Sequence, residues 1–452
     1  MKIKLILATT GVLFFMASCK KENVNSNPTP PPPTPTVDKI KDSVLLYTRD
    51  IYLWNTQIPT SFNAQSYSDP NKIMEAIRAF SIEPGFTGPV DRWSFAVKKS
   101  EWDNASSGIS KDFGLNIFFR EEGDLRVRFA EIASPAGKAG VKRGWRITKI
   151  NGSTNMSTSE ANINFIVNAI YGSTSVNLGF LKPDGNTVDV NLVADSYQEH
   201  PVFLDTVYTV AGKKAGYMVF NSFLGDTTEI YNRFSQTFSK FSQQNVDDVI
   251  IDLRYNGGGY VSVHDKLANY LAPTAANGQT LMTQAFNSIY SQWNSSTKIN
   301  KIGSLNLPRV FIIVSSSSAS ASELLINNLK PYMEVILVGP SRTYGKPVGY
   351  FPIPVGDWYI FPVSFRSTNK SGQGNYFDGF ELNKQVADGI DKDWGDITET
   401  SLASVLKYIG TGGFRANMEP RTERFEADPV VINANITLDK HTFKGMVDKR
   451  PC

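Results

Sequence analysis

A serine at the junction between a predicted strand and a predicted helix is the strongest candidate for chemistry in this chain. Residues 310–314 are apolar and β-branched, which is typical of a buried strand, and residues 320–329 carry apolar side chains at helical spacing. Ser320 would therefore stand on the turn that begins the helix. The first backbone amides of a helix have no helical partner and can bind a developing oxyanion, so Ser320 is a candidate nucleophile.

The same serine has a structural alternative. Ser320 and Glu323 are three residues apart and fit a capping box, in which both side chains only satisfy free amides at the start of a helix. Taken alone, this spacing is more often a cap than a catalytic site. The choice between the two interpretations depends on the segments before and after it.

Two further predicted strands end in turns that carry residues suited to catalysis. Residues 249–259 read VIIDLRYNGGG, an apolar strand followed by three glycines that expose backbone amides. Asp252 and Arg254 are expected to form a structural ion pair that holds this turn. Residues 335–339 form another apolar strand, after which Lys346 occurs in the sequence Tyr-Gly-Lys. Together with the strand before the serine, they fit an alternating α/β pattern.

Lys346 is the candidate base. A serine hydroxyl is a weak nucleophile and needs a positioned base. The three histidines, His200, His264 and His441, all lie outside the glycine-rich and serine-rich turns. Lysine replaces histidine in some Ser–Lys variants, but only as the neutral amine, so its pKa would have to fall well below about 10.4. The alternative for an isolated Gly-Lys is a solvated loop lysine.

Three of these segments together resemble a known family. Residues 252–259, 318–323 and 345–346 occur in the order and at the separations of the motifs of the carboxy-terminal processing (tail-specific) serine peptidases, of S41 type. The resemblance covers most of the chain from about the fortieth residue onward. It implies a Ser–Lys dyad in which Ser320 is the nucleophile and Lys346 is the base.

The resemblance also implies supporting roles around the dyad. Glu323 would support the two residues, although its negative charge near Lys346 would raise the pKa of the lysine and weaken it as a base. The oxyanion would be bound by the amide of Ala321 and by an amide of Gly257 or Gly258. Losing one such donor costs on the order of 3 kcal/mol of transition-state stabilisation.

Residues 110–196 resemble a PDZ domain. Residues 134–152 match its helix–turn–strand segment closely. Four residues occupy the place of the loop whose amides bind the terminal carboxylate of a peptide: Phe113, Gly114, Leu115 and Asn116. Such a groove takes an extended peptide by strand addition. The resemblance therefore implies protein or peptide partners with free C-termini.

Composition is that of an ordinary globular protein. The 452 residues are 41% hydrophobic and 20% charged, with a formal net charge of +3. This charge is small, and no basic run or aromatic–basic interleaving is present, so a nucleic-acid partner is not expected. The sequence has no His-x-x-x-His motif and no cysteine cluster, so neither a metal site nor a cofactor is expected.

The beginning of the chain is expected to export and anchor the protein. Residues 1–18 have two lysines, an apolar stretch and then small residues, which predicts a signal peptide too short for a permanent transmembrane helix. The ending Met-Ala-Ser-Cys resembles a bacterial lipoprotein box, which implies lipidation of Cys19 and attachment to a membrane of the bacterial cell envelope, facing the periplasm or the cell surface. The alternative is an ordinary cleavage site with an incidental cysteine. Residues 19–37 read as the lipid anchor followed by a proline-rich spacer.

The predicted fold class is multidomain α+β. The expected parts are a small helical domain at 38–109, the PDZ domain at 110–196, an α/β core of crotonase/ClpP-like type at 197–410 and an irregular tail at 411–452. Within the last two parts, local patterns predict a surface excursion at 277–307, one strand at 358–366, a closing helix at 394–409 and a candidate strand at 430–436.

These features predict a membrane-anchored serine endopeptidase that selects polypeptides by their C-termini and cleaves them with Ser320 and Lys346. The alternative is a peptide-binding lipoprotein on the same fold whose dyad is idle. The sequence indicates neither the substrates nor the oligomeric state.

Overall fold

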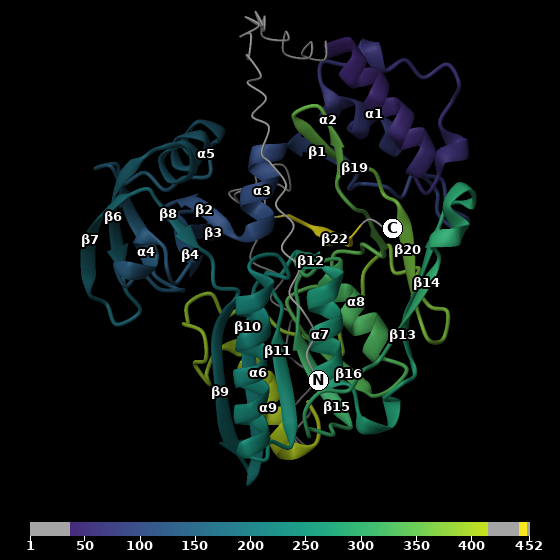
Figure 1. The fold of residues 1–452 in the computed structure, drawn as a ribbon. Helices are drawn as coiled ribbons and strands as arrows, with labels where there is room; N and C mark the ends of the chain where they lie inside the picture. Colours follow the sequence, from purple (N-terminus) through teal and green to yellow (C-terminus); the bar gives the residue numbers. More distant parts are fainter. Residues whose placement is uncertain (1–36, 415–442, 450–452) are drawn as a thin grey trace, which may run out of the picture. The chain divides into compact units, whose positions relative to one another are not determined.

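A six-stranded sheet carries the predicted strands on both sides of the serine turn. The computed structural model describes residues 37–414 and 443–449, which fall in one compact unit beginning at Val37. In spatial order the strands are β21 (Lys384–Gln385), β16 (Glu334–Gly339), β15 (Arg309–Ile313), β11 (Asp248–Asp252), β10 (Lys213–Phe220) and β9 (Val202–Val210). All neighbouring pairs are parallel except β9 and β10. The carboxyl ends of β11, β15 and β16 therefore meet at one edge, where the three turns predicted to carry chemistry begin (Figure 1).

Helices cover both faces of this sheet because successive strand residues point to opposite sides. Ile251 belongs to the same core cluster as Phe234 and Leu325, which lie on helices of one face, whereas Ile250 belongs to the cluster that contains Leu402. The helices of the first cluster are α6 (Thr227–Gln243), α7 (Val261–Leu271) and α8 (Ala321–Leu329), and the helix of the second is α9 (Thr400–Thr411). The α/β pattern predicted for the core is confirmed.

The N-terminal helices share a hydrophobic core with residues from the second half of the chain. The elements here are α1 (Val37–Ile51), α2 (Pro70–Ile77), α3 (Lys99–Ser107) and short 3-10 turns at Asn55–Gln57, Ala64–Ser66 and Arg78–Phe80. A three-stranded sheet joins β1 (Phe95–Lys98) to β19 (Trp358–Phe361) and β18 (Ile353–Val355). Tyr350 and Phe361 lie in the same core cluster as Ile73 and Trp93. This shared core brings the N-terminal region against the loop that carries Lys346.

A second antiparallel sheet has a core of its own. Its five strands, in spatial order, are β3 (Leu115–Glu121), β4 (Asp124–Ala130), β5 (Arg146–Ile150), β6 (Ser175–Leu181) and β7 (Thr187–Val193). The helices α4 (Pro135–Lys138) and α5 (Glu160–Val167) complete this unit, and α5 continues into a short π-helix at Asn168–Gly172. A strand pair, β2 (Ile109–Asp112) with β8 (Asp195–Gln198), connects the sheet to the rest of the chain. The last two strands of this sheet, β6 and β7, pair as an antiparallel hairpin.

Three local predictions for the core were wrong. The segment 277–307 is not a plain surface excursion, because it forms β13 (Thr280–Phe286) and β14 (Ser295–Lys298). The single strand predicted at 358–366 is two strands in different sheets, β19 and β20 (Phe365–Asn369), separated at Pro362, which has no amide hydrogen for a ladder. The closing helix begins at Thr400 rather than at 394, because the Glu399 side chain caps it by accepting from Leu402 N–H. The strands β14, β13 and β20 belong to a four-stranded sheet, whose last strand is β17 (Val348–Gly349), paired with β20.

The C-terminal tail was predicted to be irregular, and this is wrong for residues 445–447. They form β22 (Gly445–Val447), which pairs in parallel with β12 (Gly258–Tyr260) directly after the glycine turn. The candidate strand at 430–436, the signal peptide and Cys19 lie outside the described residues. Among the helices that are described, none combines the length and apolar character needed to cross a bilayer.

Candidate active site

Ser320 is held in a strained backbone conformation at the start of α8. Its φ is 58° and its ψ is −105°, a combination that non-glycine residues rarely adopt. The side chain is fully buried, and among the described residues its Oγ has no hydrogen-bond partner. A buried hydroxyl without a partner is costly for stability alone, so the arrangement favours a functional role for this serine.

The capping-box arrangement of Ser320 and Glu323 is present at the start of α8, but only one of its two contacts is a formed hydrogen bond. Ser320 N–H donates to Glu323 Oε2 at 2.9 Å, as a cap would require. The reciprocal contact of the Ser320 hydroxyl is missing from the hydrogen bonds among the described residues. Glu323 therefore supports the backbone of the serine, while the hydroxyl itself makes no hydrogen bond within residues 37–414 and 443–449.

The Glu323 carboxylate connects the serine turn to the lysine loop. Its Oε2 accepts from the backbone amides of both Ser320 (2.9 Å) and Lys346 (2.8 Å). Its Oε1 accepts from Thr343 Oγ1 and from Gly345 N–H, each at 2.6 Å. Burial raises the pKa of Glu323 above its usual range, and these four donors offset part of that effect. The residue acts on the two candidate catalytic residues through their backbones.

Lys346 is fully buried against aromatic rings. Its Nζ lies 3.8 Å from the ring centre of Tyr350 and 5.7 Å from that of Trp93. Burial lowers the pKa of Lys346 well below its ordinary value, whereas the negative charges of Asp91 and Glu323 act in the opposite direction. The loss of solvation therefore outweighs the raising effect that was expected from Glu323, and the environment favours the neutral amine.

The Lys346 amine does not bind Ser320 in this structure. Its Nζ donates to the backbone carbonyl of Lys444 at 3.1 Å, and no hydrogen bond joins it to the Ser320 hydroxyl. The two loops are nevertheless adjacent, because Tyr344 N–H donates to Ser318 O at 3.0 Å. The structure thus brings the serine turn and the lysine loop together, but holds the amine on a carbonyl of the C-terminal segment.

The glycine turn lies against the serine turn through Asn256. Its backbone carbonyl accepts from Ala319 N–H (3.1 Å) and from the Ser322 hydroxyl (2.9 Å). Its side-chain Oδ1 accepts from Gly258 N–H at 2.9 Å, so that amide already has a partner.

Two amides beside this contact are left without a partner. The amides of Gly257 and Ala321 donate to no described residue. A Cβ placed on Gly258 would lie 3.0 Å from Ala321 N, which shows how closely the glycine turn approaches the start of α8. The amides of Gly257 and Ala321 are therefore the pair in this region that can donate hydrogen bonds to an oxyanion.

The ion pair predicted within the glycine-turn strand is confirmed as a buried network. Arg254 contacts Asp252 at 2.7 Å and Glu399 at 2.8 Å, and all three side chains are almost fully buried. Asp388 approaches the same guanidinium at 2.9 Å and also binds Arg143 of the second sheet at 2.6 Å. These contacts fix the strand end that leads into Gly257.

The predicted carboxylate-binding loop runs from β2 into β3 of the second sheet. Its Gly114 amide is already bound, because it donates to Asp112 Oδ1 at 2.7 Å, and Tyr197 Oη donates to the same oxygen at 2.7 Å. The same loop contains Phe113 and Leu115, both buried, and Asn116. Gly114 has a φ of 74°, and a Cβ at this position would overlap the Ser134 side chain, so glycine is required here.

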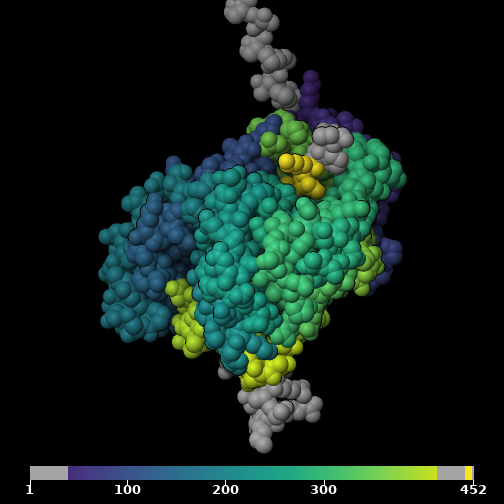
Figure 2. Space-filling model, turned by 60° about the horizontal axis from the view of Figure 1, so that its bottom comes forward, coloured from purple at the N-terminus to yellow at the C-terminus, as the bar shows by residue number. Residues whose placement is uncertain are grey.

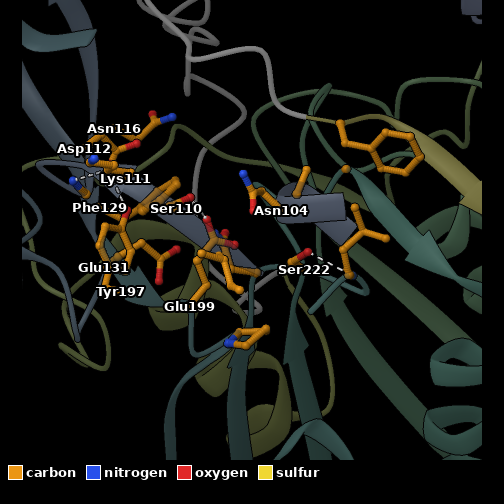
Figure 3. Close-up of a pocket in the computed structure, with 18 of the residues that line it drawn as sticks. Asn104, Ser110, Lys111, Asp112, Asn116, Phe129, Glu131, Tyr197, Glu199 and Ser222 are labelled. Atoms are coloured by element: carbon orange, nitrogen blue, oxygen red, sulfur yellow. Dashed lines mark hydrogen bonds between the residues drawn. The ribbon is translucent and has the colours of Figure 1, made fainter. Parts of the chain in front are cut away.

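A cavity of about 430 Å³ connects this loop to the glycine turn (Figure 3). Its lining includes Gly114, Asn116, Gly257 and Gly258, which belong to two different predicted sites. Asp112, Glu131 and Glu199 give one side of the cavity an acidic character, as the close-up shows. The cavity therefore runs from the predicted carboxylate-binding loop to the glycine turn.

Sequence reasoning missed the residues that surround the lysine. Trp93 and Asp91 come from the N-terminal region, which had been given no chemical role, and Tyr350 follows Lys346 by four residues. The aromatic residues near 93 were a usable signal, because a buried amine needs apolar surroundings. Within the described ranges, no group of three or more histidine, cysteine, aspartate or glutamate residues is placed to hold a metal ion.

Comparison with known proteins identifies two matching segments. Residues 214–380 match the family model described as Peptidase family S41, and residues 39–95 match the Peptidase S41 N-terminal domain. The first range contains Ser320, Glu323 and Lys346, and the second contains Trp93. Both segments that form the lysine pocket therefore fall within the matched ranges.

Relatives of established name agree with these matches. The chain is 26% identical to the carboxy-terminal processing protease CtpB of Bacillus subtilis over 56% of this chain and 50% of the relative. It is 29% identical to a carboxyl-terminal-processing protease of Picosynechococcus over 56% of this chain and 58% of the relative. The matched region thus spans about half the length of these relatives.

A solved structure shows the same fold. A protein from Bacteroides fragilis NCTC 9343, assigned to the S41 proteases, superimposes with a TM-score of 0.66 at 22% identity. The superposition covers 82% of this chain and 97% of that protein. The multidomain α+β arrangement with an N-terminal helical region is therefore shared with that structure.

Proposed function

Because the chain is a distant homologue of the S41 C-terminal processing peptidases, we propose that it is a serine endopeptidase that uses a Ser320–Lys346 dyad. One observation carries the proposal: a fully buried lysine of lowered pKa lies on a loop that Glu323 joins to the backbone of Ser320. We also propose that the α/β core at 197–410 has a fold of crotonase/ClpP-like type.

The proposed reaction has two halves. Ser320 Oγ attacks the substrate carbonyl and passes its proton to the neutral Lys346 amine, while the oxyanion binds the amides of Gly257 and Ala321. The protonated amine then gives its proton to the leaving nitrogen as the peptide bond breaks, which leaves an acyl-enzyme ester on Ser320. Water, deprotonated by the same lysine, hydrolyses this ester and restores the enzyme. Trp93 and Tyr350 keep the amine out of water so that it can accept the proton at neutral pH.

Covalent labelling tests the nucleophile. Ser320 Oγ is expected to displace fluoride from an alkyne-tagged fluorophosphonate and to give one adduct per chain, located by peptide mass spectrometry. The Ser320→Ala variant is the control and should take up no probe. An absence of labelling between pH 6 and pH 9.5 on prolonged incubation, both in the native chain and in a variant that breaks the contact of Lys346 Nζ with Lys444 O, would contradict the proposal and favour the idle peptide-binding protein.

We further propose that the second sheet, at 110–196, is a PDZ domain that delivers substrate C-termini to the cavity. Support comes from its five strands, its buried loop at Gly114 and the cavity that leads from this loop to Gly257. The Asp112 carboxylate accepts the hydrogen bond of the Gly114 amide, so a peptide carboxylate would have to compete for this donor. Like charges at this distance repel, so Asp112 is expected to reduce affinity for free C-termini.

Removing this charge gives a measurable prediction. Asp112→Asn is expected to bind fluorescein-labelled peptides with apolar, free C-termini about fivefold to tenfold more tightly than the native protein, the gain from one charge-assisted hydrogen bond. The same peptides with amidated C-termini are the control and should bind both proteins alike. Equal gains for the acid and amide forms in fluorescence anisotropy would argue against carboxylate capture at Gly114.

The location of the protein is proposed from the beginning of the sequence. Cleavage before Cys19 and acylation of that residue would hold the protein on a membrane of the bacterial cell envelope. In a bacterial expression host, the native chain should incorporate an alkyne-tagged fatty acid and sediment with membranes, and Cys19→Ser should do neither. Membrane association of the Cys19→Ser chain without label would point to another mode of attachment.

A further inference from the structure

The described end of the chain occupies the candidate active site. Residues 443–448, here called the C-terminal segment, lie between β12 and Tyr350, the residue that follows β17. Figure 1 draws their strand β22 beside β12, and in Figure 2 their yellow atoms reach the surface of the molecule. On one side, Gly445 N–H donates to Gly257 O at 3.0 Å. On the other side, Tyr350 N–H donates to Met446 O at 3.0 Å, and Asp448 N–H donates to Tyr350 O at 3.1 Å. The segment is thus bound on both edges as an added β-strand.

The same segment uses the proposed catalytic base. The carbonyl oxygen of Lys444 accepts from Lys346 Nζ at 3.1 Å, and Tyr350 Oη lies 3.4 Å from it. This is the hydrogen bond that the lysine amine makes in place of one to the Ser320 hydroxyl. A peptide carbonyl of the chain itself therefore holds the base, while the Ser320 hydroxyl has no hydrogen-bond partner in the described part of the chain.

Side chains anchor the segment on both sides of this carbonyl. Phe443 lies against aromatic rings, 5.2 Å from Trp102 and 6.1 Å from Tyr350 between ring centres. Met446 is fully buried in a cluster with Leu324 of α8. The Asp448 carboxylate accepts from Gln284 Nε2 at 2.8 Å. Several independent contacts thus fix the register of the strand.

Glycine at position 445 allows the C-terminal segment to pack closely against the residues around it. A Cβ at this position would overlap the Phe443 ring and the Tyr350 hydroxyl. Gly257, which accepts the hydrogen bond from Gly445, is similarly close, because its own Cβ would overlap Phe443 O. Glycine faces glycine where the segment passes the oxyanion turn, which lets the two backbones approach without side chains between them.

We propose that the C-terminal segment is a built-in competitor that occupies the position of the extended polypeptide substrate. This inference rests on the proposed function and adds the class of ligand that the cleft binds. That ligand is an extended peptide, added parallel to β12, with glycine at the position of Gly445 and an apolar residue after it. A strand that only completed the fold would not need to contact both the glycine turn and the base. Release of the segment frees the Lys346 amine to turn toward Ser320.

Weakening the segment is the first test. Gly445→Pro removes the amide that donates to Gly257 and should raise the initial rate of cleavage of fluorescein-labelled, unfolded casein at least about tenfold, because a tethered competitor acts at millimolar effective concentration. Lys449→Ala, at an exposed residue just outside the segment, is the matched control and should leave the rate unchanged. An unchanged or lower rate for a Gly445→Pro protein that melts normally would overturn the inference.

A binding measurement separates this inference from the proposed function. The peptide Phe-Lys-Gly-Met-Val-Asp, labelled with fluorescein, is tested on two proteins that both carry Ser320→Ala. It should bind the protein that also carries Gly445→Pro at least about tenfold more tightly than the protein with the native segment. A peptide with valine in place of glycine should bind weakly. If the glycine peptide binds as expected but no proteolysis is found, the site stands and the enzyme assignment fails. If the peptide binds neither protein, or both alike, the inference is overturned.

Discussion

Lys346→Met is expected to reduce peptide hydrolysis by about 10³-fold or more, because general-base contributions are typically 10² to 10⁴ and the described residues around Ser320 offer no other proton acceptor placed for it. Methionine has a similar length and suits the aromatic pocket of Trp93 and Tyr350, so the fold should persist. The measurement is the initial rate of casein cleavage, made in the Gly445→Pro background as well as in the native chain.

The same substitution should change stability in a direction that a surface lysine would not. The pKa of Lys346 is lowered in the fold, so between this value and about 10.4 the unfolded chain binds one more proton than the folded chain. The free energy of unfolding of the native protein therefore rises with pH across this window, by up to about 1.4 kcal/mol for each pH unit. Lys346→Met should be more stable than the native protein at neutral pH, and the difference should shrink as the pH rises.

A second lysine provides the control. Lys301 is also partly buried, with its pKa lowered to about 8, and its Nζ donates to Tyr270 O, away from the candidate site. Lys301→Met should leave casein cleavage unchanged. Urea unfolding between pH 6 and pH 10 measures the stability differences. A Lys346→Met protein that retains hydrolysis, or whose stability has the same pH dependence as the native protein, would contradict the role proposed for the lysine.

The elements around the serine could be predicted because their patterns are local. The apolar run before the turn becomes β15, and the helical spacing after it becomes α8, in which every residue is buried. The ion pair of Asp252 and Arg254 could also be predicted, since two residues of opposite charge near a strand end must find partners when they are buried. Each of these predictions needs only neighbours in the sequence.

The surroundings of the lysine could not be predicted in the same way. From its sequence alone, a Gly-Lys step in a loop is expected to leave the lysine in water. The burial of Lys346 depends on Trp93, which is more than two hundred residues away in the chain. β22 was missed for a related reason. Three residues with one glycine have little strand propensity, and they form a strand only because Gly257 and Tyr350 offer unpaired backbone groups on both sides.

Glu323→Gln is expected to lower both the free energy of unfolding and turnover. All four groups around the carboxylate are donors, and the amides of Ser320 and Lys346 share one oxygen. Glutamine replaces one of the two acceptor oxygens by a donor, whichever way it turns, and leaves two buried donors without an acceptor. Each buried group left unsatisfied costs about 1 to 3 kcal/mol, so the free energy of unfolding should fall by about 2 to 6 kcal/mol.

Turnover should fall as well, because the two amides that Glu323 holds belong to the proposed nucleophile and base. A displacement of either loop separates the reacting groups, and losses of about 10²-fold are typical of small misplacements. Thr343→Val removes only the hydroxyl donor and should have a clearly smaller effect on both quantities. Glu334→Gln, at an exposed position of β16, is the control and should change neither.

Guanidinium unfolding and casein cleavage, measured on the same preparations, decide whether Glu323 joins the two loops as described. If Glu323→Gln loses turnover without losing stability, the carboxylate acts on the reaction directly, as a charge near Lys346, rather than through the backbone. If it keeps both, the four hydrogen bonds do not hold the site together. The expected result is a joint loss, since the same Oε2 supports the backbone of Ser320 and that of Lys346.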